Sequence, residues 1–297
     1  MTLAPIVLFV YNRPWHTQQT IEALQKNSLA TDSELFIYSD APKNDSAIPL
    51  VKAVREYIKS IKGFKNVSII ERRTNYGLAS SIIDGVTRIT NEFGKVIVLE
   101  DDLVTSPHFL NYMNDGLSLY ENDENVASIH GYIYPIDKLP ETFFIKGADC
   151  WGWATWKRAW NIFEPDGKVL LEKLTSSGLQ NEADFNGSYQ YTKMLEDQII
   201  GKNNSWAIRW YMSAFLEDML TLYPGKSFVE NIGNDGSGTH SEETKVFSAI
   251  PNACFTELTK INVVENSHCR KRIEEFFLSM KRNIFYRIYN KIITVFK

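Results

Sequence analysis

Strand and helix patterns alternate along the first hundred residues. Apolar-rich runs at 6–10, 34–39, 67–70 and 95–99 predict strands, and the nearly continuous runs among them are typical of strands covered on both faces. Between these runs, apolar residues recur at helical spacing over 15–25, 48–62 and 78–93, which predicts three helices. This alternation favours an α/β fold with a mostly parallel sheet, whose ligands bind beyond the carboxyl ends of the strands.

The second half of the chain is less periodic. We expect helices at 107–121, 188–201 and 209–219, a strand at 126–129, and an aromatic segment at 148–162 that leads into a helix. A loop rich in Gly, Asn and Asp follows at 231–240. Residues 270–297 contain no Pro or Gly and mix aromatic and aliphatic residues with basic ones, which predicts a basic amphipathic helix. The chain therefore divides at about residues 104 and 268.

Composition and charge narrow the classes of protein. With 297 residues and 44% apolar residues, the chain is long enough for one large folded unit. Its three cysteines form no CxxC pair, so we expect no disulfide framework and a reducing cytosol as the compartment. The net charge is −4, but residues 269–297 carry +6, which leaves −10 on the remainder. An acidic body argues against nucleic acid as the partner.

The basic C-terminal helix at 270–297 has three interpretations. It suits binding to an anionic membrane surface, which would make the protein peripheral on the inner face of the plasma membrane. Packing on the catalytic body and a homodimer contact are the alternatives. The N-terminal apolar run has no basic segment before it, so we interpret it as a buried strand and not as a signal peptide.

Three consecutive carboxylates, Glu100, Asp101 and Asp102, follow the strand at 95–99 directly. Because they repel one another and lose hydration at the end of a buried strand, we expect a compensating cation. Mn²⁺ or Mg²⁺ suits carboxylate oxygens and completes its coordination with water and substrate phosphates. The alternative is a solvated acidic strand end before the helix at 107–121.

Several motifs, taken in order, resemble the GT-A glycosyltransferases. They are Asn12-Arg13-Pro14, Ser39-Asp40, Arg73 to Ala79, the VLEDD of 98–102 and Trp151-Gly152-Trp153, spread over roughly residues 4–160. The resemblance is strongest to bacterial family 2-like sugar transferases related to the animal N-acetylglucosaminyltransferase that initiates complex N-glycans. It implies a GT-A (Rossmann-like) fold, a nucleotide-sugar donor, a divalent metal with Asp102 as direct ligand, and inversion at the anomeric carbon. On this basis 1–104 is the nucleotide-sugar-binding half and 105–268 the acceptor-binding half.

Donor-binding residues are expected at the strand ends of the first half. Asp40 is placed to accept hydrogen bonds from uracil N3–H or ribose hydroxyls, and Arg13, Arg72 or Arg73 to meet the diphosphate. The alternative for Arg72 and Arg73 is surface charge. Gly77 allows the backbone to approach a ligand closely. The full set of predicted donor contacts is Tyr11, Asn12, Arg13, Asp40, Arg73, Asn75, Gly77, Leu78, Glu100 and Asp101.

An inverting transfer needs a carboxylate to take the proton of the acceptor hydroxyl. Asp197 is our first candidate for this base, with Glu196, Asp218 and Glu217 as rivals, although a solvated helix face is the commoner role of such pairs. His240, at the end of the 231–240 loop, is a second candidate metal ligand. Trp151 and Trp153 are expected near the acceptor, because flat indole rings stack on sugars.

These residues lead to one functional hypothesis and two alternatives. The hypothesis is a metal-dependent inverting hexosyl- or N-acetylhexosaminyltransferase. It would use a UDP-sugar donor and a glycan or lipid-linked oligosaccharide acceptor of surface polysaccharide. A nucleotidyltransferase would prefer a Gly-rich first loop, which 10–14 lacks. A non-catalytic carbohydrate-binding protein is the other alternative.

Overall fold

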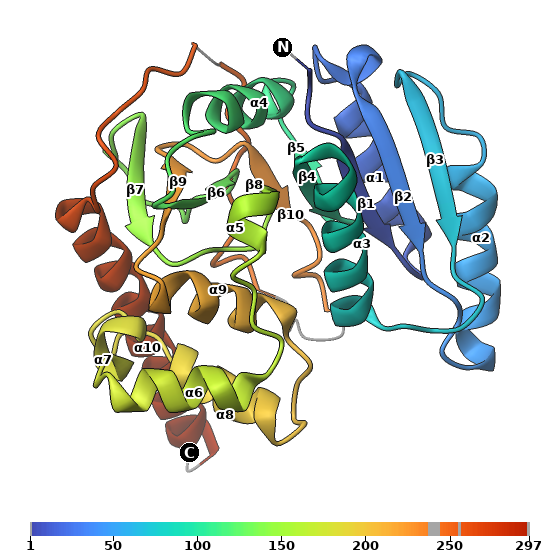
Figure 1. Ribbon diagram of the computed structural model, residues 1–297. Coiled ribbons are helices and arrows are strands. Elements are labelled where there is room, and N and C mark those ends of the chain that lie inside the picture. The colour runs from blue at the N-terminus through green and yellow to red at the C-terminus, as the bar shows by residue number, and fades with distance from the viewer. Residues whose placement is uncertain (1, 237–243, 255–256, 296–297) are drawn as a thin grey trace.

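The computed structural model describes residues 2–236, 244–254 and 257–295, with side chains as far as residue 281. A large sheet runs through the whole molecule, and helices cover both of its faces (Figure 1). Its strands, in spatial order, are β3 (Asn66–Glu71), β2 (Glu34–Ser39), β1 (Ile6–Val10), β4 (Lys95–Glu100), β8 (Trp153–Trp156), β6 (Val126–His130), β9 (Leu220–Pro224) and β7 (Thr142–Lys146). β5 (Leu103–Thr105) and β10 (Val229–Asn231) form a separate antiparallel pair.

Six strands of the sheet end at the same edge, which we call the carboxyl edge. β1 to β4 are parallel, and β6 and β9 run in the same direction because β8 is antiparallel to both β4 and β6. β7 and β8 run the other way. β8 therefore begins at the carboxyl edge, and the segment that precedes it reaches this edge beside the end of β4.

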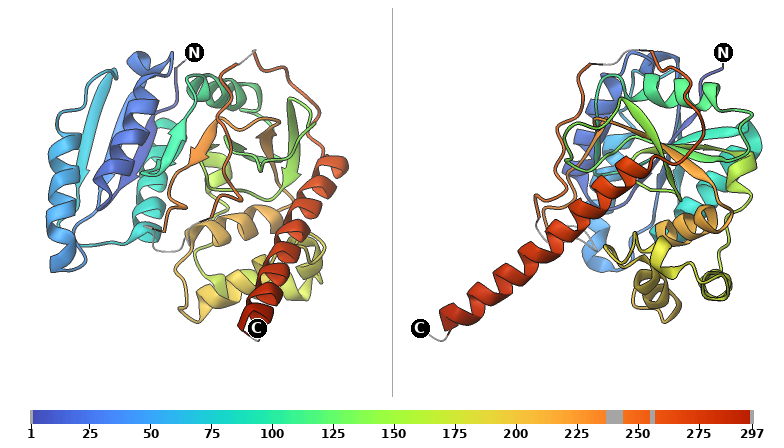
Figure 2. Two further views of the ribbon diagram at one scale, coloured as in Figure 1. Left: turned by 180° about the vertical axis from the view of Figure 1, so that it is seen from behind. Right: turned by 90° about the vertical axis from the view of Figure 1, so that its left-hand side faces the viewer.

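The helices of the first half form the outer layers. α1 (Pro14–Gln25) and α2 (Ile48–Ile58) lie on one face and α3 (Leu78–Phe93) on the other (Figures 1 and 2). β1 is buried along its whole length because this packing covers both of its faces. α3 ends at Gly94, whose left-handed backbone lets its N–H close on the Thr90 carbonyl at 2.9 Å.

The second half adds helices around the remaining strands. These helices are α4 (Phe109–Leu119), α5 (Lys157–Trp160), α6 (Gly167–Ser176), α7 (Gln180–Ala183), α8 (Tyr191–Ile199), α9 (Trp206–Leu216) and α10 (Ser267–Val295). Two short 3-10 helices, η1 (Ala30–Asp32) and η2 (Asp45–Ala47), belong to the first half. The predicted α/β class with a mostly parallel sheet and a C-terminal helix is confirmed.

Two helices begin earlier than the sequence pattern predicts. α9 begins at Trp206 and not at 209, because the Ser205 hydroxyl caps it by accepting from the Ile208 N–H at 3.2 Å. α10 begins at Ser267 and not at 270, where the Asn266 side chain accepts from the Cys269 N–H at 3.0 Å. In both cases the polar cap decides the start, ahead of the apolar spacing.

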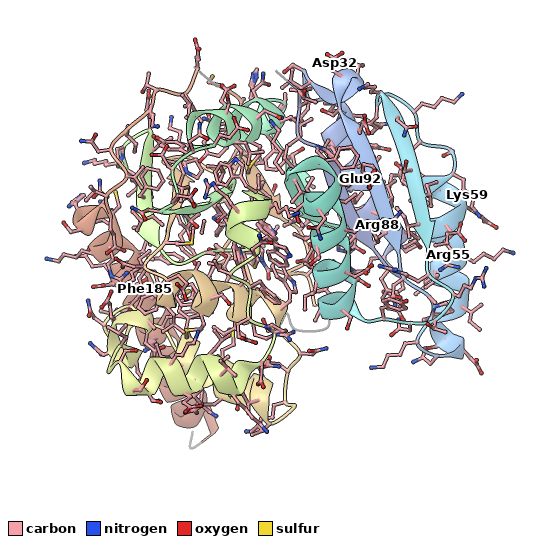
Figure 3. The ribbon with its side chains drawn as sticks, in the orientation of Figure 1. Asp32, Arg55, Lys59, Arg88, Glu92 and Phe185 are labelled. Carbon is pink, nitrogen blue, oxygen red and sulfur yellow. The ribbon has the colours of Figure 1, made fainter. Side chains whose placement is uncertain are left out.

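The first turns of α10 pack on the body, and the rest of the helix projects away from it (Figure 2). Cys269, Ile273 and Phe277 are buried there. Arg270 pairs with Glu265 at 3.0 Å and lies over the ring of Phe185, which Figure 3 labels beside α10. The first part of the predicted tail helix is thus a packing element of the body.

Candidate active site

The acidic triplet lies at the end of β4, on the carboxyl edge. Arg13, next to the first residue of α1, donates to the Asp101 carboxylate and, at 2.9 Å, to Oδ2 of Asp102. The Tyr11 N–H points to Asp101 Oδ2 at 3.4 Å, and the Thr20 hydroxyl donates to the Asp101 carbonyl at 2.9 Å. The ends of β1 and β4 are therefore joined through the predicted donor-site residues.

The charges of this group are not balanced. Burial, reinforced by the negative charges of Asp102 and Asp101, raises the pKa of Glu100 to about 8 against the opposing charge of Arg13. Burial also raises the pKa of Asp101 to about 6, although Arg13 favours its ionised form. Burial opposes the charge of Arg13, but the two aspartates outweigh it and leave its pKa above the ordinary value.

These residues fit a divalent cation. Three carboxylates lie beside the guanidinium of Arg13, and burial, together with their mutual repulsion, raises the pKa values of two of them. The described residues contain no group of three or more His, Cys, Asp or Glu side chains arranged to hold a metal. An ion here would thus be held by one or two carboxylates together with oxygens of a substrate, which is the usual arrangement for Mg²⁺.

The segment after β10 crosses over the triplet. β10 pairs with β5 directly after Asp102, and the Ile232 N–H donates to the Asp102 carbonyl at 2.9 Å. A methyl group added at Gly233 would lie 2.0 Å from Asp102 Oδ2, so only a glycine fits beside that carboxylate. Asp235 meets His16 of α1 at 3.0 Å. The first part of the predicted 231–240 loop therefore covers the site, while the predicted ligand His240 lies outside the described residues.

Asp40 binds the loop that precedes α3. Its carboxylate accepts from the N–H groups of Tyr76 at 2.9 Å and Gly77 at 2.8 Å, from the Asn75 amide at 3.1 Å, and from the Ala41 N–H at 2.8 Å. Gly77 adopts a φ of 72°, which favours glycine. Three of the predicted donor-site residues, Asp40, Asn75 and Gly77, thus meet here, and this set of bonds uses most of the acceptor capacity of Asp40.

An arginine that the sequence analysis did not single out joins the ends of β2 and β3. Arg55, labelled on α2 in Figure 3, donates to the Arg72 carbonyl at 2.8 Å and the Asp40 carbonyl at 3.2 Å. The Arg72 guanidinium lies over the Tyr76 ring, 4.3 Å from its centroid, and pairs with Asp84. Arg73 is exposed and makes no ion pair with any described residue.

The remaining predicted donor contacts, Tyr11, Asn12 and Leu78, are partly exposed. Asn12 is half-buried beside Arg13, and Leu78 is 47% exposed at the start of α3. The Tyr11 hydroxyl accepts from the Lys43 N–H at 2.9 Å, which ties the loop after β2 to the end of β1. The contacts of these residues with a donor stay predictions.

The two tryptophans predicted near the acceptor occupy different environments. Trp151 is half-buried and packs edge-on against Tyr132, with ring centroids 4.7 Å apart. Trp153 has no exposed surface and stacks on Trp206 inside the core. This placement corrects the expectation for Trp153, because a ring enclosed by other indoles presents no face to a sugar.

The predicted bases lie on the surface of the second half. Asp197 on α8 pairs with Lys193 at 2.7 Å and Lys202 at 3.4 Å, and the hydrogen bond from Lys193 lowers its pKa. Its neighbour Glu196 pairs with Lys193 as well, at 3.5 Å. Asp218 has 85% of its side chain exposed and pairs with Lys146.

Asp218 and the exposed Glu217 follow the last residue of α9, whereas Trp206, at its first residue, donates to Glu100. The eleven residues of α9 separate these positions by about 16 Å. No described contact brings any of these four carboxylates to the triplet.

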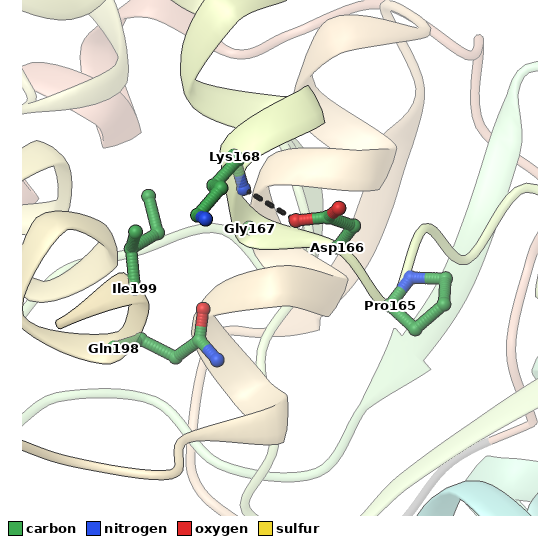
Figure 4. Close-up of a pocket in the computed structure, with 6 residues that line it drawn as sticks. All are labelled: Pro165, Asp166, Gly167, Lys168, Gln198 and Ile199. Carbon is green, nitrogen blue, oxygen red and sulfur yellow. Dashed lines mark hydrogen bonds between the residues drawn. The ribbon is translucent and has the colours of Figure 1, made fainter. Parts of the chain in front are cut away.

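Asp197 adjoins a shallow pocket of about 340 Å³ between the start of α6 and the end of α8 (Figure 4). Asp166 caps α6 there by accepting from the Lys168 N–H at 2.9 Å. A methyl group at Gly167 would meet the Gln198 amide oxygen at 2.3 Å, so the two helices are in close contact. The acidic triplet does not line this pocket.

The family assignment follows from the sequence that builds this edge. The profile of glycosyl transferase family 2 matches residues 6–166, which contain the ends of β1, β2 and β4, the acidic triplet and Trp151. The match covers more than half of the chain. The chain belongs to glycosyl transferase family 2.

Solved structures with similar folds are remote from this family 2 chain. A mannosyltransferase from Pyrobaculum calidifontis, solved with GDP-Man and Mn²⁺, shares 15% identity over 44% of this chain and 35% of its own, with a TM-score of 0.33. S. aureus TarS 1–349 shares 11% identity over 76% of this chain and 59% of its own, with a TM-score of 0.41. A Mycobacterium tuberculosis glucosyl-3-phosphoglycerate synthase, solved with Mn²⁺ and UDP-Glc, shares 10% identity over 59% of this chain and 66% of its own, with a TM-score of 0.34.

The chain thus spans between 35% and 66% of the length of these three proteins. No curated protein matches it in sequence. The relation to the N-acetylglucosaminyltransferase stays a prediction, because the family profile does not test it. Among the described helices, none is both long and apolar enough to cross a membrane.

Proposed function

We propose that this family 2 protein transfers a sugar from a nucleoside diphosphate donor to a hydroxyl of a glycan or lipid-linked oligosaccharide. The observation that carries the proposal is the cluster of Arg13, Asp101 and Asp102 at the carboxyl edge, where α/β sheets bind their ligands. A diphosphate with a divalent cation would supply the charges that this cluster lacks. UDP is our first choice of nucleotide, and Mn²⁺ or Mg²⁺ of ion.

The residues of the chain have separate tasks in this reaction. Asp102, with 14% of its side chain exposed, is the proposed metal ligand, and the bound ion would stabilise the departing diphosphate as a Lewis acid. Arg13 supplies fork-like N–H donors to the same region. Asp40 positions the 75–77 loop, and Gly233 brings the 231–236 segment close to Asp102 so that water is excluded.

The test is calorimetric titration of UDP, GDP and dTDP into the full chain, with and without Mn²⁺. We expect one nucleotide to bind in the presence of the ion, and Asp102→Ala to weaken that binding at least tenfold. Asp32→Ala is the matched control, because Asp32 is exposed and lies at the opposite edge of the sheet (Figure 3). Binding that needs neither the ion nor Asp102 would contradict the proposed metal role.

Absence of binding for all three nucleotides would contradict the transferase itself and favour a non-catalytic carbohydrate-binding protein. Cleavage of a nucleoside triphosphate at its α-phosphate would favour the nucleotidyltransferase alternative.

A further inference from the structure

A carboxylate outside the predicted set lies in the segment that approaches the end of β4. Asp149 belongs to the segment between β7 and β8, and β8 pairs with β4 so that Trp153 lies opposite Val98. The residues just before Trp153 therefore approach those just after Val98, which are Leu99 and Glu100. This approach brings 149–152 to the carboxyl edge.

Cys150 links Asp149 to the triplet electrostatically. Burial raises the pKa of the Cys150 thiol well above its ordinary value, and the charges of Asp149, Glu100 and Asp102 raise it further. One thiol therefore lies within electrostatic reach of all three carboxylates. The described contacts of Asp197, in contrast, are with two lysines of the surface.

The backbone around Asp149 is held in one conformation. Gly152 has a φ of 66°, and a methyl group there would meet Val229 Cγ2 at 2.7 Å. The Trp151 N–H donates to Nε2 of the buried His130 at 3.1 Å. Burial lowers the pKa of His130, which keeps this nitrogen a neutral acceptor. The loop is thus positioned without using the Asp149 carboxylate.

The carboxylate itself is held but remains accessible. Its Oδ1 accepts from the Cys150 N–H at 2.8 Å and its Oδ2 from the Tyr223 hydroxyl at 3.3 Å. His130 Nε2 is 3.9 Å from Oδ1, which is too far for a hydrogen bond. The Asp149 side chain is 21% exposed, so acceptor positions remain for a ligand hydroxyl.

Aromatic side chains surround this carboxylate. Burial is the main cause of the raised pKa of several nearby phenols, and the charge of Asp149 raises each of these pKa values further. The phenols belong to Tyr132, Tyr134, Tyr189, Tyr191 and Tyr223. The half-exposed Trp151 packs on Tyr132 at the same place. A carboxylate within an aromatic wall is a suitable environment for a sugar that bears hydroxyl groups.

We propose that Asp149 is the general base that takes the proton of the acceptor hydroxyl, in place of Asp197. The inference rests on the proposed transferase function. The acceptor O–H proton moves to the Asp149 carboxylate as the oxygen forms its bond to the anomeric carbon. The bond between that carbon and the diphosphate oxygen breaks, and its electron pair leaves with the diphosphate.

The test uses water and azide as acceptors, because both are defined probes. The full chain is incubated with Mn²⁺ and UDP-glucose, UDP-N-acetylglucosamine or GDP-mannose, and release of the nucleoside diphosphate is measured with and without sodium azide. Asp149→Asn is expected to slow hydrolysis by about 10²- to 10⁴-fold, which is the usual contribution of a general base. Donor affinity, measured by calorimetry, should stay within about threefold of the unsubstituted chain.

Azide separates a base from a structural residue. It attacks without losing a proton, so azide should restore nucleotide release in Asp149→Asn and yield a glycosyl azide. Asp32→Asn, at an exposed position on the opposite edge of the sheet, is the matched control and should hydrolyse the donor like the unsubstituted chain. Melting temperatures of both variants show that they fold.

Two results would overturn the inference. If Asp149→Asn hydrolyses a donor at the normal rate, or azide fails to restore release, Asp149 is not the base while the transferase function stands. If the unsubstituted chain neither binds nor cleaves any of the three donors, the proposed function fails and the base assignment fails with it.

Discussion

Arg13 is one cation among three carboxylates, and this imbalance sets the properties of the site. The guanidinium contacts Asp101 and Asp102 but not Glu100, whose described partner is the neutral indole of Trp206. Of the two carboxyls whose pKa is raised, Glu100 therefore has the higher value, about 8 against about 6 for Asp101. A buried carboxyl that stays protonated near neutral pH costs less than a buried charge.

This imbalance predicts how stability depends on pH. Glu100 and Asp101 bind their protons more tightly in the folded chain than in the unfolded chain, so the folded state holds more protons and its stability falls as pH rises. The loss begins above the unfolded values, near pH 4, and is complete above about pH 8.

With EDTA present, we expect a lower melting temperature at pH 9 than at pH 6. Glu100→Gln should remove much of the difference, because an amide cannot lose the proton. Differential scanning fluorimetry measures both chains. Equal pH dependence in the two chains would mean that Glu100 is not the group responsible.

At this scale, the motifs of the first half predicted which residues lie close together better than those of the second half did. Consecutive residues on one strand end, such as Glu100 to Asp102, form a signal that can be read without the fold. Asp149 is a single carboxylate whose environment comes from β4, β6 and β9, so no local spacing identifies it. Trp153 shows the converse, because residue type alone does not say whether an indole faces a ligand or the core.

At the scale of elements, the conformation of the loop at 75–77 depends on the side chain of Asp40, which follows β2. Asp40 is 7% exposed and accepts hydrogen bonds from Asn75, Tyr76 and Gly77, which lead directly into α3. Hydrogen bonds to a charged acceptor contribute about 1.5–3 kcal/mol each when measured singly. The loop should therefore lose its conformation when the carboxylate is removed.

Asp40→Ala should lower the free energy of unfolding by at least about 2 kcal/mol, because the freed N–H groups lose a charged acceptor. Urea denaturation measures the loss, with Asp45→Ala, at an exposed position of η2, as control. Unchanged stability with weakened UDP binding would instead support the direct nucleotide contact that we predict from the sequence.

Elements of the first half were predictable because each βα unit carries its own apolar period. β5, β7, β9 and β10 have three to five residues each, and their strand conformation depends on partners far along the chain. The sequence of β8 is rich in tryptophan and does not predict a strand by its pattern. Its position between β4 and β6 depends on pairing with both of these strands. Helix starts were displaced wherever a Ser or Asn cap preceded the apolar pattern.

At the scale of the whole molecule, α10 is a helix that starts on the body and projects away from it. Its first turns are buried on the body, while the helix continues outward as far as Val295 (Figure 2). The sequence of this helix after residue 281 includes Arg282, Arg287 and Lys291. Basic residues near an anionic membrane contribute about 1 kcal/mol each. The projecting part is therefore the place to test the membrane and homodimer interpretations.

We expect the full chain to sediment with vesicles that contain phosphatidylserine and to be released by 0.5 M salt. Exchange of Arg282, Arg287 and Lys291 for Glu should abolish this binding, since the net charge of residues 269–297 falls from +6 to zero. Equal binding to neutral vesicles would contradict an electrostatic contact. A concentration-dependent mass that is lost in the triple variant would favour the homodimer.

The reversed direction of β8 has a consequence for how such proteins diversify. Within the large sheet, a single ladder, between β4 and β8, joins the four strands that end around Arg13 and Asp40 to the four that surround Asp149. Changes in the segment before β8 alter one wall of the site, and the opposite wall keeps its own hydrogen bonds. Under the proposed function, selection would therefore be able to vary the molecule that is modified while the activated sugar stays the same.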